Sequence, residues 1–244
     1  MAINEDYIET INGVSFKMIF VEGGKVTLEY DNQKTEITVP NFHLAETPVT
    51  QELWRAVMGK DPNELRFKGN DKNPVERVSW LDIVEGNKDT NEPAFLTQLN
   101  QIKDIQFTDY RLPSEAMWQF AAQGGNKSNG YEFSGGNHLK EVGWYNKNSH
   151  RETKPVKLKL PNELGFYDMS GNVWEWCADK WTTNLKHLPQ NGLPNKIADD
   201  KKRDIRVVRG GSWSGSDLGC RVSLRVRYFS YYRYGYVGFR LSRY

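Results

Sequence analysis

From Asn126 to the C-terminus, the sequence is a series of short aromatic pieces broken by Gly, Asn and Ser. WYNKNSH, LGFYDMSGNVWEWCADKW and the terminal stretch are all of this kind. Such a pattern is typical of short strands joined by turns and loops rather than of long helices. The sequence contains neither a tandem repeat nor a linker that would separate two domains. We therefore expect one domain that spans residues 1–244.

The first forty residues have the composition of β-strands. Residues 14–30, VSFKMIFVEGGKVTLEY, are two β-rich runs joined by Glu22-Gly23-Gly24, and this arrangement predicts a hairpin. Residues 34–40, KTEITVP, add another strand.

Helix signals follow in the next part of the chain. Thr50 is placed to cap a helix that ends at Gly59, and Ser79 is placed to begin a second one. Residues 95–99 continue the helical character, and Ser114 caps the clearest helix start, which closes at Gly124-Gly125. Strands and helices in separate runs predict an α+β fold.

Charge and composition exclude several classes of protein. The formal net charge is only +2, so nothing in the composition demands a nucleic acid or an anionic membrane as partner. No run of 18 apolar residues could form a membrane-spanning helix, and MAINEDYIET lacks the features of a signal peptide. We expect synthesis in the cytoplasm, with either retention there or display on a phage particle or cell surface by a route that this chain does not encode.

The residues from Arg209 to Arg240 use an unusual set of amino acids. The stretch holds five of the twelve tyrosines and five arginines after Arg209. From Ser214 to Val237 none of the 24 residues is Lys, Glu, Gln, Met or Trp, although these types supply 57 of the 244 residues in the chain. A window of this length would be expected to hold about five or six of them. Tyr, Ser, Gly and Arg are the residues that recognition surfaces use.

Two structural interpretations of this stretch are open. In the first, Val222, Leu224, Val226 and Tyr228 alternate with Arg221, Ser223, Arg225 and Arg227, which is the pattern of a half-buried strand with its arginines outward. The second interpretation is an exposed surface. It suits YFSYYRYGY, where the alternation fails and burial would require a partner for each Tyr hydroxyl. We therefore expect the tyrosines to form an exposed interaction site.

Six motifs, in this order, resemble a known family. They are FHLAETPVTQELWRAVMG, NPVERVSW, YRLPSEAMWQFAAQGG, LGFYDMSGNVWEWCADKW, RVVRGGSW and GFRL, and they run from about Phe42 to Leu241. They resemble the formylglycine-generating-enzyme (sulfatase-modifying factor) branch of the C-type lectin fold. The resemblance implies a C-type lectin-like α+β fold.

The resemblance also implies enzymatic alternatives. In the oxidase that makes formylglycine, two cysteines after the GGS[WY] motif bind copper; here one position falls on Cys220 and the other on Gly215. The reactive pair is incomplete, because thiolate chemistry of this kind needs both sulfurs. Related iron enzymes use a histidine cluster, whereas the histidines here are scattered singly, as His43, His138, His150 and His187. Whether Cys177 and Cys220 form a disulfide stays open.

A third branch of the family is the variable protein of diversity-generating retroelements. In that branch, mutation at adenines turns asparagine codons into a mixture that excludes Lys, Glu, Gln, Met and Trp. RGGSW, CRVS, Arg225, Arg233 and GFRL resemble its fixed framework. The resemblance implies that the following positions in the 209–240 region vary and contact a ligand: Ser214, Gly215, Ser216, Leu218, Gly219, Leu224, Val226, Arg227, Tyr228, Phe229, Tyr231, Tyr232, Tyr234, Gly235 and Tyr236.

Two further sets of residues have both a functional and a structural interpretation. Asn172 and Glu175, in GNVWEW, are candidate calcium ligands, because calcium binds oxygen atoms; alternatively they satisfy backbone groups of the loop. Asp109, Arg111 and Glu115 could form an acid–base set, but they flank a helix start, where acidic side chains suit the helix dipole.

We therefore predict a non-enzymatic protein that binds a protein or glycan on a cell or host surface and requires no cofactor. The alternatives are a formylglycine-generating-type oxidase, another metal-dependent enzyme of the same fold, and a structural protein with one fixed partner.

Overall fold

The computed structural model describes residues 4–244 apart from 63, 88–89, 106–107 and 201. Its helices are α1 (Gln51–Met58), α2 (Trp80–Val84), α3 (Phe95–Ile102), α4 (Glu115–Ala122) and α5 (Leu139–Val142). Its strands are β1 (Tyr7–Ile11), β2 (Val14–Val21), β3 (Gly24–Tyr30), β4 (Gln33–Val39), β5 (Phe42–Ala45), β6 (Trp174–Lys180), β7 (Ile205–Arg209), β8 (Val226–Phe229), β9 (Val237–Gly238) and β10 (Ser242–Arg243). The predicted α+β class is confirmed.

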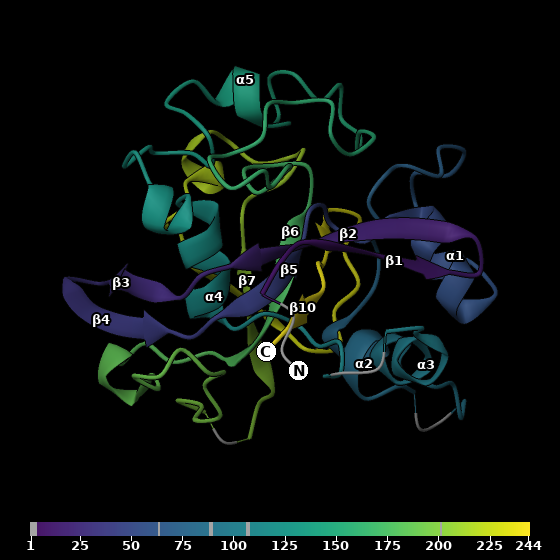
Figure 1. Ribbon diagram of the computed structural model, residues 1–244, viewed down its shortest axis with the longest axis horizontal. Coiled ribbons are helices and arrows are strands. Elements are labelled where there is room, and N and C mark those ends of the chain that lie inside the picture. Colours follow the sequence, from purple (N-terminus) through teal and green to yellow (C-terminus); the bar gives the residue numbers. More distant parts are fainter. Residues whose placement is uncertain (1–3, 63, 88–89, 106–107, 201) are drawn as a thin grey trace.

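The strands form three sheets, arranged as Figure 1 shows. One has the order β1-β2-β5-β10, a second is the β3-β4 hairpin, and the third has the order β8-β7-β6-β9. β9 runs parallel to β6, and the other pairs are antiparallel. Because β10 pairs with β5, the C-terminal strand returns to the early part of the chain.

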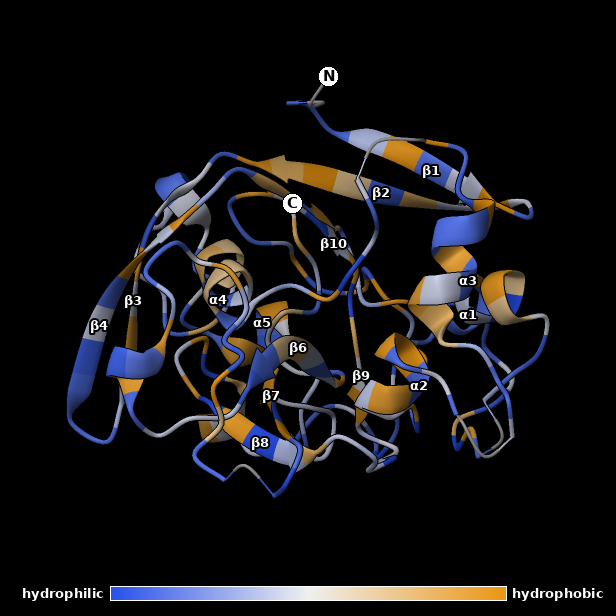
Figure 2. Ribbon diagram, turned by 90° about the horizontal axis from the view of Figure 1, so that it is seen from below, coloured by the Kyte–Doolittle hydropathy of each residue, from blue (hydrophilic) through white to orange (hydrophobic). Residues whose placement is uncertain are grey.

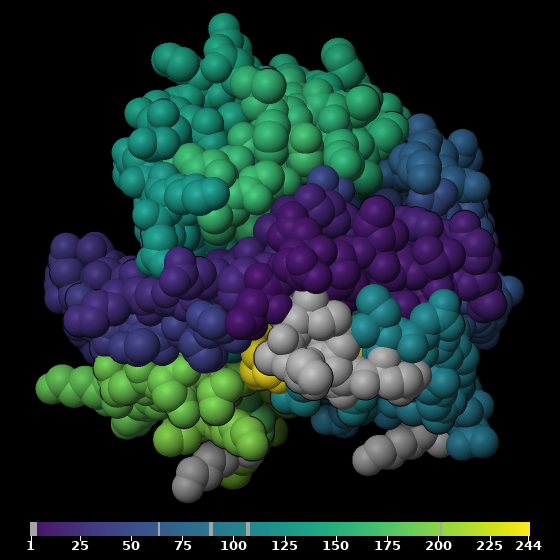
Figure 3. Space-filling view, in the orientation of Figure 1, coloured from purple at the N-terminus to yellow at the C-terminus, as the bar shows by residue number. Residues whose placement is uncertain are grey.

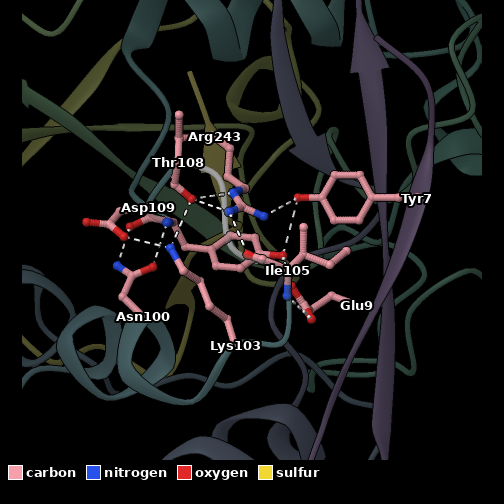
Figure 4. Close-up of polar contacts among 9 residues, drawn as sticks. Tyr7, Glu9, Asn100, Lys103, Ile105, Thr108, Asp109 and Arg243 are labelled. Carbon is pink, nitrogen blue, oxygen red and sulfur yellow. Dashed lines mark hydrogen bonds and ion pairs between the residues drawn. The ribbon is translucent and has the colours of Figure 1, made fainter. Parts of the chain in front are cut away.

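Polar contacts hold the two ends of the chain together, as Figure 4 shows. Arg243 is 1% exposed, and its guanidinium donates to the carbonyl oxygens of Ile105 and Thr108. It also donates to the hydroxyl of Tyr7, 3.1 Å away on β1. These bonds satisfy a buried cation and tie β10 to both the first strand and the segment after α3.

The predicted hairpin over residues 14–30 is wrong in its pairing. Both strands exist, but β2 pairs with β1 and β5, whereas β3 pairs with β4. The glycines between them serve close packing rather than a hairpin turn. A Cβ atom at Gly23 would lie 2.4 Å from the carbonyl oxygen of Val39. The chain passes from one sheet to the next at this point.

The hairpins lie one strand earlier and one strand later than expected. Asn12-Gly13 joins β1 to β2, and Asp31-Asn32 joins β3 to β4. All four residues have positive φ, from 46° to 83°, which is the geometry that two-residue hairpin turns require.

The predicted helix starts at Thr50, Ser79 and Ser114 are confirmed, whereas the helix expected over residues 95–99 runs from Phe95 to Ile102. Thr50, Ser79 and Ser114 each have extended φ and ψ and accept a hydrogen bond from the backbone N–H three residues later. Ser79 also forms a capping box with Asp82. Gly59 ends α1 in the left-handed conformation, with φ of 74°.

Two large apolar clusters fill the interior, and the third sheet contributes to both, with Trp176 and Val208 in one and Cys177 and Val207 in the other. One joins α1, α2 and α3 to Trp176 and Phe239; the other packs α4 against β3, β4 and β7. The N-terminal strands form a band across the middle of the face seen in Figure 3, where little of the C-terminal segment is visible. β8 lies at the opposite end of the molecule from β1 and β2 (Figure 2). Among the described residues, no helix is both long enough and apolar enough to cross a membrane.

Candidate ligand-binding surface

Buried side chains anchor residues 209–240 to the rest of the molecule at intervals. The fully buried guanidinium of Arg209 donates to the side chain of Gln119 on α4 and, at 2.8 Å, to the carbonyl of Val222. The indole Nε1 of Trp213 donates to the carbonyl of Gly235, 2.8 Å away. The bond from Trp213 links the start of the segment to the loop that precedes β9.

Two further anchors are buried ion pairs. Arg225 binds Glu115 at the start of α4 through two hydrogen bonds of 2.6 and 2.8 Å. Arg240 binds both oxygens of Glu175 at 2.7 Å, and all four side chains are at most 1% exposed. Burial raises the pKa of Glu115, but Arg225 and Arg209 outweigh that effect and hold it below its ordinary value.

The predicted alternation of apolar and arginine side chains from 221 to 228 is wrong for two residues. Arg225 is buried, whereas Leu224 is 36% exposed. The physical reason is a turn in which the Leu224 N–H donates to the Arg221 carbonyl, so the strand begins only at Val226. Because no strand covers residues 221–225, a period of two does not apply there.

The positions predicted to vary lie mostly at the surface. Exposed side chains are those of Ser214, Ser216, Leu218, Leu224, Arg227 and Tyr231, and half-buried positions are Gly215, Gly219, Val226, Tyr228, Phe229, Tyr232, Tyr234 and Tyr236. Gly235 alone among them is buried. The residues that form the anchors are all buried. The side chains at the exposed positions can therefore change without removing an anchor.

Six aromatic rings form a continuous group, here called the aromatic ladder: Tyr228, Phe229, Tyr231, Tyr232, Tyr234 and Tyr236. Neighbouring ring centroids lie 4.9 to 5.5 Å apart along the ladder. Tyr234 and Tyr236 stack almost parallel, with an interplanar angle of 7°. Aromatic contacts of this kind fix ring orientation and keep the surface rigid.

The ladder has an inner and an outer end. Tyr228, Tyr234 and Tyr236 pack against the core cluster that contains Trp176, and the ring of Tyr228 lies 6.3 Å from that indole. Tyr231 is 53% exposed at the outer end. The inner rings support the fold, whereas the outer rings are available for contact.

The predicted positions from 214 to 219 lie on a separate loop. Its backbone is bonded to a neighbouring segment of the same chain, because the Asn146 N–H donates to the carbonyl of Gly215. Leu218 borders a groove of about 340 Å³ together with Tyr145 and Arg221. Trp213, which precedes this loop, links it to the ladder through its bond to Gly235.

A buried carboxylate lies beneath Gly235. Glu76 is fully buried; its Oε1 accepts the backbone N–H groups of Arg66 and Phe67, and its Oε2 has no hydrogen-bond partner among the described residues. Burial raises the pKa of Glu76, against the effect of those two hydrogen bonds. A Cβ atom at Gly235 would lie 3.3 Å from this free oxygen and 2.9 Å from Cδ of the exposed Arg66 side chain.

We expect Gly235→Ser to be more stable than Gly235→Ala by about 1–2 kcal/mol. Both variants displace Arg66, but only the serine hydroxyl can donate to Oε2 of Glu76. Urea unfolding of the two variants measures the difference. Equal stabilities would mean that the oxygen does not accept the new hydroxyl.

The candidate calcium ligands do not fit a calcium ion. Both oxygens of Glu175 bind Arg240, and one also accepts the Trp118 indole N–H at 2.6 Å. The amide of Asn172 binds the backbone N–H and carbonyl of Lys154. A cation at Glu175 would have to replace a guanidinium that is already in place. Among the described residues, no group of three or more His, Cys, Asp or Glu could hold a metal.

The two cysteines are free thiols in separate parts of the interior. Cys177 lies in the cluster around α4, and Cys220 lies in a smaller cluster with Phe133. Burial raises the pKa of the Cys220 thiol to about 12, despite a hydrogen bond from the backbone of Ser212, and raises that of Cys177 well above its ordinary value. Both thiols are therefore protonated near neutral pH.

We expect Cys220 in the folded protein to react with a thiol reagent at pH 8 about a thousandfold more slowly than an ordinary cysteine, because so little thiolate is present. Both thiols should react at once in guanidinium chloride. Titration with a chromogenic disulfide measures this. A fast reaction in the folded state would instead identify a reactive cysteine.

Sequence reasoning missed the acidic residues that hold this surface in place. Glu115 was assigned to the helix dipole, and the roles of Glu76 and of Asp82, which pairs with Arg233 at 2.6 and 2.8 Å, had no local signal. Asp109 pairs with Lys103 and Glu115 pairs with Arg225, so the candidate acid–base set is not assembled. The available signal was the excess of arginines over the single acidic residue of the 209–240 segment, Asp217, since a buried arginine then needs a carboxylate from elsewhere in the chain.

Comparison with known proteins identifies relatives of this chain. The model of the sulfatase-modifying factor enzyme 1-like domain matches residues 10–244. A Paenibacillus barcinonensis protein named chaperone protein LppX is 33% identical over 86% of this chain and 83% of its own length. The formylglycine-generating enzyme of Thermomonospora curvata is 30% identical over 63% of this chain, and the match spans half of that enzyme.

Solved structures agree with this assignment. Treponema denticola variable protein 1 superimposes with a TM-score of 0.78 at 32% identity, over 98% of each chain. PvdO from Pseudomonas aeruginosa has a TM-score of 0.73 at 21% identity, which shows a shared fold. The chain therefore belongs to the family of sulfatase-modifying factor enzyme 1-like domains, and it has the C-type lectin-like fold of the formylglycine-generating-enzyme type.

Proposed function

We propose that this chain is a non-enzymatic binding protein that presents the 209–240 segment as a diversified surface within a single domain of residues 1–244. The observation that carries the proposal is the separation of anchors from changeable positions. Arg209, Trp213, Arg225 and Arg240 are buried and bonded, whereas the positions expected to vary are exposed or half-buried, apart from Gly235. A scaffold that tolerates many sequences at one surface needs this separation, because the buried ion pairs and hydrogen bonds that hold its backbone must not involve the changing side chains.

Similarity to Treponema denticola variable protein 1 supports this proposal, since it extends over 98% of both chains. The missing residue types between Ser214 and Val237 support it independently, because adenine mutagenesis of asparagine codons cannot produce them. The ligand is a protein or glycan on a cell or host surface, met by a chain displayed on a phage particle or cell. Nucleic acid and direct membrane insertion have no part in this function.

The formylglycine-generating relatives make an oxidase the competing function. Against it, Gly215 stands where a second copper-binding cysteine is needed, and Cys220 is a buried thiol of raised pKa. Metal analysis of the purified protein separates the two functions: one copper per chain would favour the oxidase.

The direct test is the DNA around the gene. We expect a near-copy of the codons for residues 209–240 that differs only where the copy carries adenines, next to a gene for a reverse transcriptase. Such a copy would also identify the changeable positions one by one. Its absence would count against diversification and favour a binder with one fixed partner.

A further inference from the structure

Strand β8 is the edge of its sheet, and half of its backbone hydrogen-bonding groups point away from that sheet. It pairs with β7 on one side, with Arg206 opposite Tyr228 and Val208 opposite Val226. In the same register, the Ser230 N–H donates to the carbonyl of Asp204 at 2.9 Å. Because hydrogen-bonded pairs alternate along an antiparallel ladder, residues 226, 228 and 230 bond inward, and Arg227 and Phe229 present their N–H and C=O groups outward.

Most of these outward groups have no partner. The carbonyl of Phe229 accepts the Tyr232 N–H at 3.0 Å. The N–H and C=O of Arg227 and the N–H of Phe229 have none within the part of the chain that the structure describes. Natural proteins usually protect such an edge, because it is a template for another strand.

The side chains around this edge belong to the proposed diversified surface. Phe229 stacks on Tyr231 with ring centroids 5.5 Å apart, so the outer end of the aromatic ladder adjoins the open edge. Arg227 is exposed, and its guanidinium lies over the indole of Trp181 at 5.2 Å. No carboxylate of the described residues forms an ion pair with Arg227.

We infer that β8 binds its ligand by strand addition, taking up an extended acidic segment of a protein whose backbone pairs with Arg227 and Phe229. The inference rests on the proposed function and specifies its ligand as a protein segment. Backbone pairing supplies affinity that does not depend on side chains, and alternate side chains then supply specificity. Such a contact survives changes of residues 226–229 to any residue other than proline, so nearly every variant would keep one part of the interaction. The preference for acidic residues comes from Arg227, so it is specific to this sequence and would change in a variant with another residue at that position.

A second copy of the chain is a poorer occupant of the same edge. Antiparallel pairing of two β8 strands would bring two Arg227 side chains close together with no acidic residue of the strand between them. Like charges at facing positions of a sheet are destabilising.

The test uses a random linear peptide library displayed on phage, selected against the purified protein. We expect selected peptides to be rich in acidic and β-branched residues. In solution they should protect the backbone amides of Arg227 and Phe229 from hydrogen exchange. A parallel titration with lysine-rich versions of the same peptides should give no protection, and Arg227→Glu should reverse the preference.

Two variants at one position isolate the backbone contribution. Phe229→Pro removes the outward N–H without removing a ladder bond, since that N–H faces away from β7. Phe229→Ala removes the ring but keeps the N–H. We expect Phe229→Pro to bind the peptides about five- to tenfold more weakly than Phe229→Ala. If the proline variant does not fold, amide protection in the unmodified protein decides the question.

Any of the following results would overturn the inference. Equal binding by both variants, without protection of these amides, would exclude strand addition. If Tyr231→Ala and Tyr232→Ala still abolished that binding, the proposed function would stand while the strand-addition mechanism failed. If peptide binding ignored all of these changes, the proposed surface itself would be wrong. A dimer that Phe229→Pro dissociates in sedimentation would make the occupant a second copy.

Discussion

Replacing Arg240 by Met is expected to lower the free energy of unfolding by about 3–5 kcal/mol. The change leaves the carboxylate of Glu175 buried with only the Trp118 indole to bind it. It also removes donors from the carbonyls of Ala45 and Tyr167, so two segments lose a shared anchor. An unpaired charge in the interior costs far more than the pair itself contributes.

Arg233→Met is the matched control for this effect. Arg233 binds Asp82 with the same two-point geometry, but it is 38% exposed. Water solvates both partners there, so the loss should be less than about 1 kcal/mol. Urea unfolding curves of the two variants and the unmodified protein measure both values. Similar losses in the two variants would mean that burial of the Glu175 pair does not determine its importance.

The second large effect concerns binding rather than stability. We expect Tyr231→Ala combined with Tyr232→Ala to weaken the binding of the selected peptides tenfold or more. The midpoint of thermal unfolding should stay nearly unchanged. Both rings belong to the outer end of the ladder and contact each other, Phe229 and Tyr234 rather than the core. Exposed aromatic side chains at the centre of a surface commonly supply most of its binding energy.

Tyr228→Ala tests the other end of the ladder. Its ring packs against the core cluster near Trp176, so its removal should cost about 2 kcal/mol of stability. Tyr234 also packs against that cluster and is therefore left unchanged in the binding test. Thermal unfolding and peptide titration of both sets of variants give the comparison. A large loss of stability in the outer variant would identify those tyrosines as core residues.

Sequence by itself determined the features that depend on neighbouring residues. The caps at Thr50, Ser79 and Ser114 are local hydrogen bonds, and each begins a helix at the expected residue. The α+β class follows from the same local patterns, and the ordered motifs from Phe42 to Leu241 identify the family. The unusual residue alphabet of the 209–240 segment marked the surface whose aromatic residues the fold brings together.

Only the tertiary structure decided which distant segments meet. β2 and β3 have strand sequences, but their pairing partners depend on the packing of the whole chain, so the expected hairpin between them does not form. Arg225 and Glu115 are 110 residues apart, and no local pattern could show that the arginine turns inward to reach that carboxylate. The open edge of β8 likewise exists because the sheet ends there. Periodicity and capping depend on contacts between residues that are close in the sequence. The stability of buried charges and the position of sheet edges depend on contacts between distant segments, which form only when the chain folds.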